Sequence, residues 1–293
     1  GVFWRPPAPP PAPLRRRAAL LLAGASPSLL HAAPLPSPLP GPAPAAAAAP
    51  AAARSSAIEA LSRTVVPGKA PAVLRVAFHD AGTYRAADGT GGANGSVQYE
   101  LGRPESFGLK RGLRPILEAR EAAAGTAAGG LSVADFIYLG GAYAVRLTGG
   151  PDFTAAVPLG RVDAPGEDPE GRMPSEELDG AGLRAAFAEQ GLSAQELVAL
   201  AGAHTVGGKG FGEPLAFDNS YYTTLLKKPW ADPSASKADL EMASHIGLPS
   251  DKALPDDEEC RRWLEVYAAD QRRFFEDFEA AFVKLSTQGA AFA

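Results

Sequence analysis

The sequence predicts an all-α protein. From residue 55 onward, most of the chain consists of stretches in which apolar residues recur every three or four positions, and this spacing is typical of amphipathic helices. Two stretches begin with a serine followed three residues later by an acidic residue, Ser132 with Asp135 and Ser193 with Glu196. That pattern marks the start of a helix. Strand patterns are weak, and the chain shows no internal repeat.

Seven segments carry the helical pattern. The fourth, residues 132–146, is apolar almost throughout, which predicts a buried helix, and Gly149 and Gly150 should end it. The last segment places large apolar residues from Trp263 to Leu285 at helical spacing, which predicts one long amphipathic helix. In chain order, the expected helices span residues 57–65, 71–81, 109–123, 132–146, 175–190, 193–203 and 260–286.

The first 58 residues differ in composition from the rest of the chain. They contain no Asp or Glu, include five Arg, and consist mainly of Ala and Pro, so they cannot bury enough apolar surface to form a core. A basic, acid-free head is typical of an organelle transit peptide, and residues 15–24 also resemble a lumen-directed signal. We expect residues 1–58 to be a disordered segment that targets the chloroplast stroma or lumen. The alternative is a plain Pro-rich tail, with the protein in the cytosol.

Residues 59–293 are the expected folded domain. Their 235 residues suffice for one large domain or two lobes. Five of the 28 basic residues lie in the head, which leaves 23 basic against 33 acidic side chains and a net charge of about −10. Nucleic acid is therefore excluded as an expected partner. The apolar run in the head is far shorter than the roughly 20 residues that span a bilayer, so no membrane span is expected. The oligomeric state is left undefined.

The single cysteine, Cys260, rules out an internal disulfide and a thiolate metal cluster. Acidic residues surround it in the segment 256–259 and disfavour its thiolate. We therefore expect an inert thiol and not a nucleophile.

Arg75, Phe78 and His79 lie three and four positions apart within the expected helix 71–81. At that spacing a guanidinium, an aromatic ring and an imidazole share one helix face and can overhang one pocket. Cleavage of a peroxide O–O bond needs a base that moves a proton and a fixed cation that stabilises developing negative charge. The trio therefore indicates chemistry on a peroxide.

A second histidine, His204, follows the expected helix 193–203. Haem iron is commonly held by one histidine whose other ring nitrogen needs a hydrogen-bond acceptor, and Asp251 is the candidate acceptor. A lone histidine on an apolar helix is more often an ordinary core or helix-end residue. However, the chain has only four histidines, and only His79 and His204 lie in organised apolar helix patterns.

Taken together, six segments around these residues resemble the intracellular (class I) plant haem peroxidases. The resemblance runs from about Lys69 to Gly289 in the family's order, and within that group it is greatest to the plant ascorbate peroxidase-related proteins. It implies an all-helical, two-lobed haem peroxidase fold with one b-type haem between the lobes. The matching segments are residues 74–84, 91–96, 160–163, 196–205, 217–222 and 248–254.

The resemblance also implies a role for each candidate residue. By motif position, Arg75 is the distal cation, His79 the distal base, His204 the axial ligand of the haem iron, and Asp251 its hydrogen-bonding partner. Hydrogen peroxide would be the oxidant, and a small organic molecule would donate the electrons.

Two departures lie on the distal side. Phe78 stands where ascorbate peroxidases carry a Trp, as it does in many secreted plant peroxidases, and activity should survive that change. Ser106 stands near the position of the Asn that orients the distal imidazole in the family. Its shorter side chain leaves open whether it supports His79, and with it the pKa and tautomer of that ring.

A third departure lies after His204. The segment up to Phe217 is shorter than in ascorbate peroxidases and lacks both their proximal Trp and the Arg that binds ascorbate, so ascorbate as donor is left open. Phe211 is its only aromatic residue, and a phenyl ring is hard to oxidise, so the oxidising equivalents should stay on the cofactor. Thr205 and Asp218 match oxygen ligands of a monovalent cation in the family, although the shortened segment removes other ligands.

Two functions remain open from the sequence. The first is a haem peroxidase that reduces hydrogen peroxide with a small organic donor. The second is a haem-binding or haem-free protein with little turnover that keeps the fold for a structural or regulatory role. The intact set of Arg75, His79, His204 and Asp251 favours the first, because a protein freed from catalysis has no physical need for the distal pair.

Overall fold

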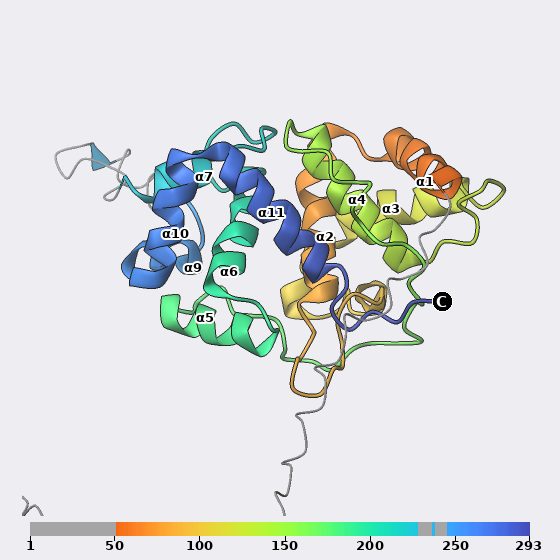
Figure 1. Ribbon diagram of the computed structural model, residues 1–293, viewed down its shortest axis with the longest axis horizontal. Coiled ribbons are helices and arrows are strands. Elements are labelled where there is room, and N and C mark those ends of the chain that lie inside the picture. The colour runs from red at the N-terminus through yellow and green to blue at the C-terminus, as the bar shows by residue number, and fades with distance from the viewer. Residues whose placement is uncertain (1–50, 228–235, 238–244) are drawn as a thin grey trace, which may run out of the picture. The chain divides into compact units, whose positions relative to one another are not determined.

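The structure is a computed structural model that describes residues 51–227, 236–237 and 245–293 (Figure 1). These residues form helices joined by loops, and their only extended pairing is two isolated β-bridges. The predicted all-α class is therefore confirmed. The described α-helices are α1 (Ala51–Thr64), α2 (Ala70–Ala81), α3 (Lys110–Ala122), α4 (Val133–Leu147), α5 (Gly180–Glu189), α6 (Ala194–Ala201), α7 (Ser220–Leu225), α9 (Pro249–Ala253), α10 (Glu258–Ala269) and α11 (Gln271–Leu285).

The helices form the two expected lobes. In the first lobe, α2 and α1 both pack against α3 and α4. In the second, α6 contacts α5 and α10, and α10 also packs on α7. Helix α11 packs against α6, and Figure 1 shows it running between the two groups. The lobes are joined through the segment between α4 and α5, so residues of α2 and α6 can face each other across the junction.

Helix α4 forms the centre of the first lobe. All of its residues from Val133 to Val145 are buried, as the uniformly apolar pattern predicts. The Ser132 hydroxyl accepts a hydrogen bond from the Asp135 amide at 3.0 Å, which confirms the predicted N-cap. No helix in the described part of the chain is both long and apolar enough to cross a bilayer.

Helix α6 begins with the predicted capping box. The Ser193 hydroxyl accepts from the Glu196 amide at 3.2 Å, and the Glu196 carboxylate accepts from the Ser193 amide at 2.7 Å. These two bonds satisfy donors that a helix start would otherwise leave unpaired. They also fix the direction in which α6 leads to His204.

The first helix starts earlier than expected. Helix α1 begins at Ala51, so the predicted boundary between residues 58 and 59 falls inside it. Alanine is the strongest helix former, and the small side chains of Ala53 and Ala57 are buried against the lobe. The compositional bias of the head therefore continues into the fold by eight residues, about two helical turns. Residues 1–50 lie outside the described residues, so the targeting segment stays a prediction.

Two other expected helices differ from the structure, each because of an aspartate. Helix α5 starts at Gly180 and not at residue 175, because Asp179 accepts a hydrogen bond from the Gly182 amide and caps it. The expected single helix 260–286 is wrong: it is two helices, α10 and α11. Asp270 interrupts it with φ −137° and ψ 95°, and its carboxylate caps α11 by accepting from the Arg273 amide.

Cys260 is buried in α10. Burial raises the pKa of its thiol to about 12, and the neighbouring Asp257 adds to the shift. A thiol in this state is protonated at neutral pH, in agreement with the inert role expected from the sequence.

Candidate active site

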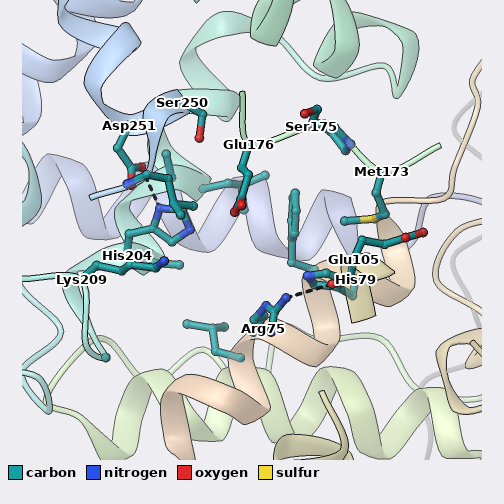
Figure 2. A pocket seen from close by; sticks show the side chains of 18 of the residues that line it. Arg75, His79, Glu105, Met173, Ser175, Glu176, His204, Lys209, Ser250 and Asp251 are labelled. Atoms are coloured by element: carbon teal, nitrogen blue, oxygen red, sulfur yellow. Dashed lines mark hydrogen bonds and ion pairs between the residues drawn. The ribbon is translucent and has the colours of Figure 1, made fainter. Parts of the chain in front are cut away.

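A cavity of about 980 Å³ lies between the lobes and is lined by Arg75, Phe78 and His79 of α2 on one side and by His204 on the other. Figure 2 shows Arg75 and His79 pointing into this space from α2, opposite His204 and Asp251. The volume lies at the upper end of the range of roughly 300–1,000 Å³ found for ligand sites. The structure thus brings together the two histidines that the sequence singles out.

Buried contacts fix the rotation of α2. The carboxylate of Asp80 accepts hydrogen bonds from the amides of Gly95 and Val97 and, at 2.9 Å, from the hydroxyl of Tyr138. Burial raises the pKa of Asp80 to about 7, an effect that these three donors oppose. With Asp80 held on the core side, the preceding residue, His79, is turned toward the cavity.

Two main-chain oxygens hold the guanidinium of Arg75. It donates to the carbonyl of Phe107 at 2.8 Å and to the carbonyl of Glu105 at 3.0 Å. Gly108, with φ +82°, makes the turn that follows these carbonyls. Desolvation lowers the pKa of Arg75, while the charge of Glu176 acts in the opposite direction. An arginine remains charged under such shifts, so a fixed cation faces the cavity.

His79 is a neutral base in this structure. Burial, together with the positive charge of Arg75, lowers the pKa of its imidazole to about 3. His79 is 9% exposed as a residue, and its ring lies edge-on to that of Phe78 with ring centroids 6.2 Å apart. At neutral pH this imidazole is unprotonated and can accept a proton.

This pKa predicts how stability depends on pH. In the unfolded chain His79 takes up a proton near pH 6.5, its ordinary pKa, but in the folded state only near pH 3. Between these values the unfolded state binds more protons, so the free energy of unfolding falls as the pH falls, by up to about 1.4 kcal/mol per pH unit for one residue.

Urea unfolding at several pH values checks this prediction with the variant His79→Leu. The wild type should lose stability relative to the variant as the pH drops below about 6.5. His245→Leu, at an exposed position, is the matched control and should keep the steep wild-type dependence. Parallel curves for wild type and His79→Leu would contradict the buried, neutral histidine.

Ser106 lies apart from the cavity that His79 faces. It is 4% exposed and sits in the 3₁₀ turn Pro104–Ser106, outside the lining of the cavity. No hydrogen bond joins its hydroxyl to His79 among the described residues. The reason is the turn itself, because its amide donates to Arg103 and its carbonyl accepts from Leu109, which holds the residue inside the loop.

His204 lies in a 3₁₀ turn, Gly202–Thr205, that continues directly from α6. Its Nδ1 is 2.8 Å from Oδ1 of Asp251, and Oδ2 of Asp251 accepts from the Leu248 amide at 2.7 Å. Burial alone would lower the pKa of His204, but the charge and hydrogen bond of Asp251 outweigh it and raise the pKa. The side chain is 39% exposed, because the ring faces the cavity and leaves Nε2 free.

Tyr221 is a member of this site that the sequence did not reveal. Its hydroxyl donates to Oδ1 of Asp251 at 2.8 Å, the same oxygen that pairs with His204, and its side chain is fully buried. Phe211 packs on the Tyr221 ring with centroids 4.7 Å apart and lies outside the cavity lining. The pair Tyr221-Tyr222 was visible in the segment 217–222, but nothing in its spacing indicated which phenol reaches Asp251.

The two residues of the expected cation site also lie together. The Thr205 hydroxyl donates to Oδ1 of Asp218 at 3.0 Å, and the Ser220 amide donates to the same oxygen at 2.8 Å. These bonds join the start of α7 to the turn that carries His204. The cation itself stays a prediction.

The remaining lining comes from loops and from α6. Leu197 and Leu200 contribute an apolar wall from α6, and Lys209 lies near His204 (Figure 2). Glu176 projects into the space between the two histidines in the same view. Loop residues of this kind carry no periodic pattern, so their positions could not be predicted from the sequence. The loop residues Met173, Ser175, Glu176 and Lys209 line the cavity, together with Glu105 of the turn Pro104–Ser106 and Ser250 of α9.

This set fits a haem. A flat apolar macrocycle suits the apolar walls, an iron needs one free histidine nitrogen, and Nε2 of His204 meets that need with Asp251 behind it. The cations Arg75 and Lys209 provide positive charge along the cavity for an anionic cofactor.

Comparison with known proteins agrees with the site. The family model described as peroxidase matches residues 53–270. A protein named Putative L-ascorbate peroxidase 6, of Arabidopsis thaliana, is 49% identical over 230 residues, which cover 78% of this chain and 67% of that protein. The cytosolic L-ascorbate peroxidase 1 of Oryza sativa subsp. japonica is 41% identical over 240 residues, 76% of this chain and 86% of that protein. L-ascorbate peroxidase 3 of Arabidopsis thaliana is 38% identical over 239 residues, 78% of this chain and 77% of that protein.

The family match covers residues 53–270, well over half of the chain, and the all-helical fold agrees with it. The chain therefore belongs to the peroxidase family, as a class I plant haem peroxidase related to the ascorbate peroxidases, an oxidoreductase that reduces hydrogen peroxide.

Proposed function

We propose that one haem b binds in the cavity between His79 and His204, and that Arg75 and His79 activate hydrogen peroxide beside it. The observation that carries this proposal is the opposed pair of imidazoles in one cavity. The imidazole of His79 is neutral, and no hydrogen bond to it is found in the described part of the chain. The imidazole of His204 is hydrogen-bonded to the buried carboxylate of Asp251.

His204 would hold the iron through Nε2, since Nδ1 is engaged by Asp251. The carboxylate fixes the tautomer and ring orientation and makes the imidazole a more basic ligand. When bound, haem supplies a redox-active iron that accepts the oxidising equivalents of the peroxide.

His79 would move the proton that O–O cleavage requires. Its neutral ring accepts the proton from one peroxide oxygen and returns it to the other, which departs as water. Arg75 stabilises the negative charge that develops on the departing oxygen, and its two carbonyl partners keep the guanidinium in place while this happens.

Replacing Arg75 tests the role of the fixed cation. Arg75→Leu should retain haem and slow its reaction with peroxide by about 10²–10³-fold, the usual cost of losing one stabilising donor. Arg75→Lys should recover only part of the rate, because an ammonium cannot reproduce the planar fork that spans two carbonyls. Stopped-flow absorbance of the haem band measures both. Wild-type rates in the Leu variant would contradict the role.

The overall proposal is tested with two additions to the purified protein. Adding haem should give a histidine-ligated haem spectrum. Adding hydrogen peroxide should then change that spectrum rapidly, and a later addition of an electron donor should restore it. A bound haem that does not respond to excess peroxide would instead support the second function considered from the sequence, a haem-binding protein with little turnover.

The electron donor is proposed to be a small organic reductant. The relatives are named for ascorbate, an anion, but residues 205–216 contain no Arg and only one Lys, Lys209. Lys209 lines the cavity and could attract an anionic donor. The rates of oxidation of ascorbate and of a neutral phenol should be measured in wild type and in Lys209→Ala. If ascorbate depends on the Lys209 charge, the variant should oxidise ascorbate more slowly and the phenol at the wild-type rate.

For the compartment, we propose that the acid-free head directs the protein to the chloroplast. The support is its composition alone, with five Arg and no acidic residue in residues 1–58. A fluorescent protein fused behind this segment should accumulate in plastids. Fluorescence throughout the cytosol would overturn the proposal.

A further inference from the structure

We propose that this enzyme has a second oxidation site at Trp263, connected to the cavity by a relay of three tyrosines, Tyr221, Tyr222 and Tyr267. The relay would allow it to oxidise phenolic donors that are too large to enter the cavity. The inference rests on the proposed function, because the oxidising equivalents come from the reaction of haem with hydrogen peroxide.

The inner end of the relay touches the haem-binding residues. The Tyr221 ring lies edge-on to the His204 ring with centroids 6.0 Å apart, and its hydroxyl donates to Asp251. Tyr221 thus combines an oxidisable phenol, contact with the expected iron ligand and a carboxylate that can receive the phenolic proton. This changes the expectation from the sequence, in which Phe211 was the only aromatic candidate near His204.

The middle of the relay is Tyr222. Its ring lies 5.1 Å from that of Tyr221 and 5.2 Å from that of Tyr267, spacings that are typical of rings in direct contact. Its hydroxyl donates to the carbonyls of Val198 and Ala199. A carbonyl does not take a proton from a phenol, so Tyr222 serves as a bridge across which the electron passes.

The outer end repeats the inner arrangement. The Tyr267 hydroxyl donates to Oδ2 of Asp277 at 2.9 Å, so a second phenol in the relay is paired with a carboxylate. Its ring lies 6.0 Å from the indole of Trp263, which is also on α10 and is partly exposed. Helix α10 lies on the outer side of its lobe (Figure 1). The four side chains therefore lead without a gap from His204 to the surface.

Tyr138 in the other lobe shows that a buried tyrosine beside a carboxylate is not sufficient. Its hydroxyl also donates to a carboxylate, that of Asp80, but the guanidinium of Arg161 lies 4.6 Å from its ring centroid. A cation over the ring disfavours removal of an electron from it. No cation–π contact is found on the rings of the relay in the described part of the chain.

The electrons and protons of the relay balance. One electron passes from Trp263 through Tyr267 and Tyr222 to Tyr221 and on to the oxidised haem site, and a donor at the surface then reduces Trp263. The proton of each oxidised carboxylate-paired phenol crosses to its partner, Asp251 or Asp277, and returns when the phenol is reduced. Two donor molecules each lose one electron and one proton, and one peroxide takes up both electrons and both protons to form two waters.

The surface around Trp263 points to a neutral phenolic donor. Exposed residues of both signs flank it on α10, Glu259 and Arg262 among them, and Arg261 is paired with Glu265. A mixed surface of this kind selects neither anions nor cations. A partly exposed indole offers part of its aromatic face to an aromatic donor, and a phenol carried on a polymer can reach it without entering the cavity.

Peptide mass spectrometry tests the relay without relying on turnover. Haem-loaded wild type treated with peroxide and no donor should accumulate oxidised Trp263, because the relay has no external electron source. Tyr267→Phe should lose this product, since its ring still packs but no longer supplies a phenol. Asp277 keeps its bonds from Gln195 and Arg273 in this variant, so the fold should persist. Tyr143→Phe, a buried tyrosine outside the relay, is the matched control.

A donor experiment tests the surface site itself. Trp263→Phe should lose the oxidation of a phenol coupled to dextran and keep wild-type oxidation of the same phenol free in solution. Equal oxidation of the dextran-linked phenol by wild type and Trp263→Phe would overturn the inference, as would unchanged oxidation of Trp263 in Tyr267→Phe. Loss of both donors in Trp263→Phe would also overturn it, because a surface site that serves only large donors leaves oxidation of the free phenol unchanged.

Failure of the proposed function would look different. In that case the wild type would not bind haem, or its haem band would not respond to peroxide, before any donor or variant is compared. If the wild type reacts with peroxide but Trp263 stays unmodified, the proposed function stands and the relay is contradicted.

Discussion

His204→Ala is expected to abolish stable haem binding while leaving the helical fold intact. The imidazole is the only described histidine besides His79 that lines the cavity, and its Nε2 is the free nitrogen that would hold the iron. Loss of a residue that merely supports a metal ligand costs about 10–100-fold in affinity, so loss of the ligand should cost more. Haem titration followed by absorbance measures the effect, and circular dichroism confirms the fold.

The matched control for this variant is His245→Ala. His245 is exposed and does not line the cavity, so its replacement should leave haem affinity unchanged. If His204→Ala bound haem as tightly as the control does, His204 could not be the iron ligand.

His79→Leu is expected to have the converse effect, with haem retained and the reaction with peroxide slowed by about 10²–10⁴-fold, the range that general acid–base groups contribute. Leucine fills the space but accepts no proton. Stopped-flow absorbance gives the rate with peroxide. The wild-type rate should stay constant from about pH 8 to pH 5 and fall only near pH 3, where the imidazole becomes protonated.

A second substitution separates the proton-accepting role from a steric one. His79→Ala leaves space in which added imidazole can bind, and imidazole should recover part of the lost rate in this variant but not in His79→Leu. If His79 and His204 variants showed the same pattern of haem loss and slowed reaction, the two histidines would not have distinct roles.

The parts of the fold that depend on neighbours in sequence were predictable. The capping residues Ser132 and Ser193 act over three positions, and the structure has both helix starts where the sequence placed them. Asp270 acts over the same range, yet the apolar periodicity on both sides of it hid the break between α10 and α11. A single polar residue in a long apolar pattern can mean a surface position or a cap, and only the backbone dihedrals distinguish the two.

In the candidate site, too, the features set by local sequence were predictable, and most of those set by packing between distant segments were not. Arg75, Phe78 and His79 share a helix face, so their convergence follows from local geometry. The sequence predicted Asp251 as the hydrogen-bond acceptor for His204, and the structure places its Oδ1 2.8 Å from Nδ1 of His204. Contacts such as that of Tyr221 with Asp251 depend on how α7 packs against the turn after α6, and no local pattern encodes that packing.

The way in which Arg75 is held has a consequence for variation among related chains. Main-chain oxygens are present whatever the side chain, so the identities of residues 105 and 107 can drift without releasing the guanidinium. Gly108 has no such freedom, because its φ of +82° costs other residues about 1–2 kcal/mol. Selection on this arrangement would therefore leave its trace in an unremarkable glycine and not in the two residues that make the bonds.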